Sequence, residues 1–114
     1  MGNAIDLSVF RELQDTAGAD FVTELVDTFF EEAPGMLAAL RSARTAGQAD
    51  AFRRAAHSLK SNSLTFGATA LAAQARALEL GGLREDVAGD NAAIDALEQC
   101  FADAAAALRE LRNG

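Results

Sequence analysis

Several residue types are scarce in this chain of 114 residues, and each shortage narrows what the protein can be. Tryptophan and tyrosine are absent and there is one proline, whereas alanine and leucine dominate, a composition that favours helix. The lone Cys100 excludes an intramolecular disulfide and fits a reducing compartment. No apolar run approaches the roughly 20 residues that span a bilayer, and no signal-peptide pattern opens the chain. We therefore expect a soluble, cytoplasmic protein with no membrane partner.

Positive charge is also scarce. Ten Lys and Arg against 17 Asp and Glu give a formal net charge of -7, which disfavours phosphate-rich partners such as nucleic acid. One histidine, one cysteine and no paired-cysteine motif argue against a zinc site, so no metal is expected. Gly81-Gly82 lacks the spacing of a phosphate-cradling glycine loop, and the chain is too short for an ATP-binding domain beside a helical one. We expect no cofactor in this chain and no autonomous kinase or ATPase activity.

Apolar residues recur at helical spacing, and these series predict the elements. Four long helices are predicted over about residues 20–47, 48–64, 68–81 and 90–112, after a short one over about 7–14. Asp90 or Asn91 can cap the last helix. Short loops between long amphipathic helices indicate an all-α, antiparallel, up-down four-helix bundle. We expect residues 1–114 to form this single domain, with the extra N-terminal helix covering one end.

Pro34 stands inside the 20–47 series. Proline removes one backbone donor and therefore kinks or divides a helix. The apolar series continues in phase beyond it to Leu37 and Leu40, which favours a kink in one helix. Four amphipathic segments in one chain favour a monomer, and a chain that runs from Met1 to just past the last predicted helix favours a free-standing protein.

The only histidine, His57, lies in the predicted 48–64 helix. At about 100° per residue, the side chains within about 60° of it are those of Arg53, Arg54, Lys60, Ser61 and Leu64. Those near the opposite pole are Phe52, Ala55, Leu59 and Phe66, which must face the bundle. The imidazole therefore faces water rather than the core. An ordinary solvated polar face stays open as an alternative.

The chemistry open to this histidine is limited. Neutral imidazole is a nucleophile that can attack phosphorus, and much of an exposed imidazole is neutral at pH 7. Lys60 lies one turn away, where its ammonium can offset phosphoryl charge, and the small Ser61 lets another protein's backbone come close. A Ser–His–carboxylate catalyst needs a pocket, which a plain bundle does not obviously offer. The exposed stripe formed by His57 and the five side chains beside it suits a phosphoryl carrier better than a hydrolase.

This stretch resembles the motif H-x-L-K-G-S-S-x-x-x-G-A of the histidine-containing phosphotransfer (HPt) domains of bacterial and eukaryotic phosphorelays. The matching residues are His57, Leu59, Lys60, Ser63, Gly67 and Ala68. Ser61 stands where the family often has glycine, and Asn62 where it often has serine. We expect Asn62 to turn inward and hydrogen-bond to the bundle. The likeness covers most of the chain and is weakest at its N-terminus.

The resemblance implies that His57 is the phosphoacceptor, through its outer ring nitrogen, and that Lys60 stabilises the phosphoryl group. In family members a Gln or Glu on the next helix can bond the inner ring nitrogen. Glu79 stands at the matching distance, while Gln74 is a less favoured substitute and a merely solvated Glu79 is the alternative. The implied reaction is reversible transfer between a receiver-domain aspartate and His57, with Mg²⁺ held by the receiver.

The implied partners are response-regulator receiver domains and a hybrid histidine kinase. We expect their docking surface to contain Arg53, Arg54, Ser61 and Leu64. An outward leucine among charges suits a contact, although single surface leucines are common. The alternative function is a helical binding module that docks or sequesters a receiver without being phosphorylated. The sequence names neither the partners nor the direction of phosphoryl flow.

Overall fold

The computed structural model describes residues 4–113, so residues 1–3 and Gly114 of the expected domain lie outside the described part. The elements are α1 (Leu7–Ala17), α2 (Ala19–Ala46), α3 (Ala49–Thr65), α4 (Thr69–Gly81) and α5 (Val87–Asn113). Residues 4–113 contain no strand, so the predicted all-α class is confirmed. None of the helices in this part is long and apolar enough to cross a bilayer.

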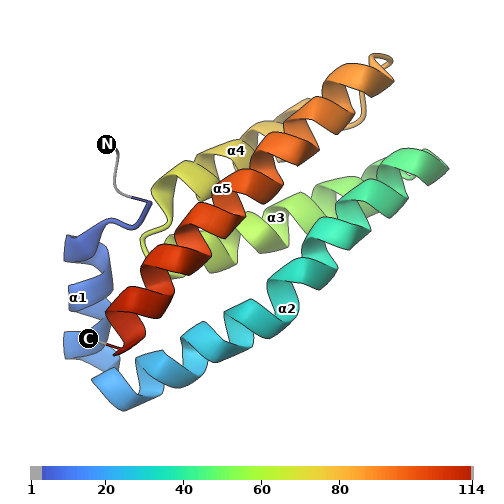
Figure 1. Cartoon of the computed structure of the whole chain (residues 1–114). Helices are drawn as coiled ribbons and strands as arrows, with labels where there is room; N and C mark the ends of the chain where they lie inside the picture. The colour runs from blue at the N-terminus through green and yellow to red at the C-terminus, as the bar shows by residue number, and fades with distance from the viewer. Residues whose placement is uncertain (1–3, 114) are drawn as a thin grey trace.

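Helices α2 to α5 run in alternating directions, and α1 crosses one end of the bundle (Figure 1). Each long helix packs against two neighbours, because α2 contacts α3, α3 contacts α4, α4 contacts α5, and α5 returns to α2. The turn after α2 is made by Gly47, whose left-handed backbone (φ 68°) lets the chain reverse at once. The predicted antiparallel up-down bundle with an extra N-terminal helix is therefore confirmed.

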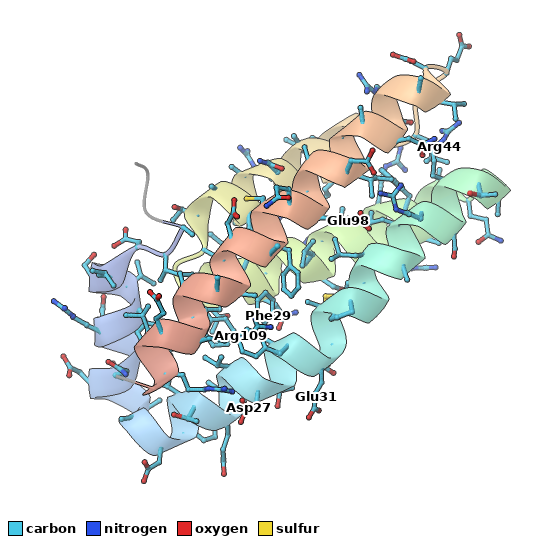
Figure 2. The ribbon with its side chains drawn as sticks, viewed as in Figure 1. Asp27, Phe29, Glu31, Arg44, Glu98 and Arg109 are labelled. Atoms are coloured by element: carbon cyan, nitrogen blue, oxygen red, sulfur yellow. The ribbon has the colours of Figure 1, made fainter. Side chains whose placement is uncertain are left out.

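The apolar series of the sequence form the core between the long helices. Phe29 of α2 lies at its centre, with its ring centroid 5.3 Å from that of Phe66 and 5.6 Å from that of Phe101 (Figure 2). Burial of one leucine or phenylalanine contributes roughly 1.5–3 kcal/mol. Packing of these stripes therefore stabilises helices that would be marginal alone.

Helix α2 continues through Pro34, as the unbroken apolar phase predicts. Its ribbon changes direction near the middle, so the proline bends one helix rather than dividing it (Figure 1). Ala33 and Leu37 remain buried on either side of the bend. The bend therefore leaves the core face of α2 intact.

The start of α5 differs from the prediction, because the helix begins at Val87 and Asp90 is not its cap. Asp86 caps it instead, since its Oδ1 accepts from the Gly89 amide at 2.9 Å. Asp90 is only 1% exposed and accepts from Arg84 Nε at 2.7 Å and from Arg44 Nη1 at 3.2 Å. Burial acts to raise the pKa of Asp90, but its hydrogen bonds from Arg84 and the charges of both arginines hold that pKa below its usual range. The Asp90 carboxylate therefore forms ion pairs with Arg44 and Arg84 instead of capping the helix, as the sequence had predicted it would.

The segment before α1 is fastened to the α3–α4 turn. The Asp6 amide donates to the Gly67 carbonyl at 2.7 Å, while Asp6 Oδ1 caps α1 by accepting from the Ser8 amide at 3.0 Å. Gly67 has φ 79°, and a Cβ there would lie 2.8 Å from the Asp6 carbonyl oxygen. Only glycine fits this close approach of two backbones without a shift. The turn that ends α3 therefore also fixes the entry to α1.

Candidate functional site

Helix α3 presents His57 to solvent, as its helical phase predicts. Phe52 and Leu59 are fully buried on the opposite face, whereas the His57 side chain is 59% exposed. The burial of the apolar face fixes the rotation of α3 about its axis. The imidazole therefore stands on a rigid helix with one edge open to an approaching molecule.

The carboxylate of Glu79, on α4, joins the two motif side chains of α3. Its Oε2 lies 2.7 Å from His57 Nδ1, and its Oε1 lies 2.7 Å from Lys60 Nζ. An ionised carboxylate only accepts, so Nδ1 must carry the proton that it donates. A neutral His57 in this arrangement has an unprotonated Nε2 with its lone pair available.

The same contacts determine the electrostatics of the site. The hydrogen bond from Lys60, and then that from His57, hold the pKa of Glu79 below its ordinary value of 4.5, so the carboxylate stays ionised. The Lys60 side chain is only 21% exposed, because its ammonium folds against α4 to reach Glu79. Lys60 is thus less open to solvent than its place on the polar stripe indicates.

Gln74, the less favoured substitute for Glu79, does not contribute to this arrangement. It is exposed on α4, and none of the hydrogen bonds among residues 4–113 joins it to His57. Of the two alternatives for Glu79, the structure shows the contact with His57 rather than a carboxylate held only by solvent.

A shallow depression lies beside the imidazole. It is lined by Arg53, Arg54, His57, Ser58 and Glu79. Helical phase grouped both arginines with His57, whereas Ser58 was missed because it stands farther round the helix. The guanidinium of Arg53 packs on the end of α4, since a Cβ on Gly82 would lie 3.1 Å from its Nη2.

The remaining motif residues separate into inner and outer positions. Ser61 and Leu64 are exposed on the stripe that carries His57, with Leu64 52% exposed. Ser63 is buried and donates to the Leu59 carbonyl at 2.6 Å. The expectation for Asn62 is wrong, because its Nδ2 donates to the Ser58 carbonyl of the same helix at 2.8 Å. A carbonyl one turn away satisfies this amide without a contact to another helix.

No group of three or more His, Cys, Asp or Glu side chains within residues 4–113 is arranged to hold a metal ion. The site consists of one imidazole, one carboxylate and nearby cations. That set of groups can present a nucleophilic nitrogen and offset the charge of an anionic substrate.

Comparison with known proteins agrees with this chemistry. A family model described as the Hpt domain matches residues 24–110. The crystal structure of histidine-containing phosphotransfer protein B (HptB) from Pseudomonas aeruginosa PAO1 is similar, with a TM-score of 0.82 and 30% sequence identity. The alignment covers 99% of this chain and 97% of that one. No curated protein matches the sequence significantly.

Proposed function

The chain belongs to the Hpt domain family, whose function is histidine phosphotransfer in phosphorelays, and we propose that His57 is its phosphoacceptor. The observation that carries this proposal is the bond between His57 Nδ1 and Glu79 on an exposed ring, which leaves Nε2 of the neutral imidazole without a proton. His57 is also the only histidine in the sequence. Glu79 is a positioning residue, because it acts through the imidazole.

The proposed step is an in-line displacement at phosphorus. The lone pair of Nε2 forms the N–P bond as the P–O bond to the receiver aspartate breaks, and that electron pair returns to the aspartate carboxylate. The ring gains a positive charge, which the Glu79 carboxylate offsets through the Nδ1 proton. The reverse step returns the phosphoryl group to an aspartate. The receiver supplies Mg²⁺, so this chain needs no cofactor of its own.

Lys60 stabilises the phosphoryl group in this proposal. Its ammonium already lies on the same carboxylate as the imidazole, which supports a place beside the reacting nitrogen. Part of its charge is offset by Glu79 at rest, so the arriving phosphoryl group competes with Glu79 for Lys60.

The partners we propose are receiver domains of response regulators, together with a hybrid histidine kinase upstream. The exposure of Arg53, Arg54, Ser61 and Leu64 around His57 supports this face as the docking surface. We further propose that the chain acts as a monomer in the cytoplasm, where its single cysteine suits a reducing compartment. It acts as an intermediate, and its phosphoryl group comes from a partner rather than from ATP.

One labelling experiment tests the acceptor. The protein is mixed with a phosphorylated receiver domain, and acid-labile, base-stable phosphate is followed on it. We expect label on the wild type and none on His57→Gln, while the wild type mixed with ATP alone stays unlabelled. Lys60→Ala should slow transfer more than it weakens receiver binding. Receiver binding without label on the wild type would support a sequestering module instead.

A further inference from the structure

A cation that is not already paired is the one best placed to contact the phosphoryl group directly. Glu79 engages Lys60 Nζ at 2.7 Å, and that side chain is mostly buried. The depression beside the ring is lined by Arg53 and Arg54, and not by Lys60. The open side of His57 is therefore bordered by arginine.

The two arginines differ in the contacts that their guanidinium groups already make. Arg53 lies 3.7 Å from Asp50 and packs its guanidinium against the Gly82 end of α4. Arg54 has no ion-pair partner within 4.0 Å among residues 4–113 and is exposed. Of the two arginines in the depression, Arg54 is thus the one without an ion pair within 4.0 Å in the described part of the chain.

The direction of the imidazole also favours Arg54. Nδ1 points to Glu79 on α4, so Nε2 points away from α4. Arg54 and Ser58 line a second depression, shared with Glu31 and Glu32 of α2, which places them on the α2 flank of the ring. Figure 2 shows the side chain of Glu31 extending outward from α2, and none of the ion pairs within residues 4–113 joins it to Arg54. A helical side chain also leans over the turn before it, which directs the ring of His57 towards residues 53 and 54.

We infer that Arg54 is a catalytic residue that binds the phosphoryl oxygens as the group arrives on His57 Nε2. The inference rests on the proposed function of His57. The guanidinium fork donates two parallel N–H bonds to phosphoryl oxygens, which a lysine cannot do with the same geometry. Lys60 and Arg54 then border the acceptor from its two sides. Arg54 forms no covalent bond in this step, because its role is to offset the negative charge of the phosphoryl oxygens.

The test uses phosphoramidate, a small phosphoryl donor that needs no docking surface. His57 Nε2 forms the N–P bond as the P–N bond of the N-protonated donor breaks, and the electron pair of that bond leaves with neutral ammonia. The initial rate of phosphohistidine formation is measured by intact mass for the wild type, Arg54→Ala, Arg54→Lys and His57→Gln. Arg11→Ala on α1 controls for net charge. Circular dichroism confirms that each variant folds.

We expect Arg54→Ala to react at least about tenfold more slowly, because even one charge-assisted hydrogen bond lost from the transition state has this effect. Arg54→Lys should recover part of the rate, and Arg11→Ala should match the wild type. Equal rates for the wild type and Arg54→Ala, with His57→Gln unlabelled, would limit Arg54 to docking and overturn the inference. A wild type that accepts phosphoryl groups from neither phosphoramidate nor a receiver would overturn the proposed function itself.

Discussion

Replacing Glu79 by glutamine separates the two bonds that meet at this side chain. Each carboxylate oxygen accepts one donor at 2.7 Å, Oε2 from His57 and Oε1 from Lys60. Glutamine has one carbonyl oxygen and one NH₂ group, so it can accept from only one of these donors. Because the ammonium is the stronger donor, the carbonyl should turn to Lys60. The NH₂ group then faces Nδ1 of His57.

The glutamine variant should therefore have the wrong histidine tautomer. An NH₂ group opposite Nδ1 favours an unprotonated Nδ1 and puts the proton on Nε2, the nitrogen that must attack. Loss of one charge-assisted hydrogen bond corresponds to roughly a tenfold change in the tautomer ratio and in the transfer rate. Glu79→Ala removes both acceptors without adding an opposing donor, so it should slow transfer less than Glu79→Gln.

A double variant makes the test specific. In Lys60→Ala/Glu79→Gln the carbonyl has only His57 to accept from, so the Nδ1–H tautomer should return. The tautomer is read from the ¹⁵N shifts of the ring nitrogens, and the rate from transfer out of a phosphorylated receiver. Glu110→Gln on α5 controls for the lost charge. An unchanged tautomer and rate in Glu79→Gln would refute the reasoning, as would a double variant with no tautomer recovery.

Three further predictions concern charge and backbone. The Glu79 carboxyl should titrate below 4.5 when its pKa is measured by NMR. Because the folded pKa is depressed, the stability from its contacts should be lost as pH falls through the folded pKa. A measured pKa of 4.5 or above would contradict the contacts. Asp90→Asn should lower the free energy of unfolding in urea by about 3 kcal/mol, because Arg44 is only 14% exposed, and a loss below about 1 kcal/mol would mean that the buried pair behaves like an exposed one. Gly67→Ala should lower the free energy of unfolding by at least about 1–2 kcal/mol and speed hydrogen exchange at the Asp6 amide. Gly35→Ala has open space at its Cβ and should raise the free energy of unfolding by up to about 1 kcal/mol in the same urea assay.

Local periodicity was sufficient to predict the bundle and the outward face of His57. The 3.6-residue period fixes which side of α3 is buried, and Phe52 and Leu59 leave no other rotation. The bend at Pro34 followed from the same rule, since an apolar phase that continues across a proline requires one helix. These features depend on residues that are close in sequence, so the spacing of residues along the chain is enough to predict them.

The parts that periodicity alone did not predict depend on contacts between distant residues. Asp90 forgoes the cap because Arg44, 46 positions away, reaches it across the bundle. The contact between His57 and Glu79 spans 22 positions and depends on how α3 packs on α4, so periodicity alone could not supply it. Likewise, the low exposure of the Lys60 side chain results from its contact with α4, which the sequence of α3 alone does not predict. The family resemblance directed attention to Glu79, and the geometry then showed its two partners.

His57, Lys60 and Glu79 all come from one helical hairpin, in which residues 66–68 connect α3 to α4. Joining groups across so short a connection carries little loop-closure entropy. The proposed acceptor and its positioning carboxylate are thus joined within one hairpin, while packing of α3 on α2 and of α4 on α5 fixes the rotation of both helices. The contact between these side chains therefore depends on one short connection in the chain rather than on a long loop.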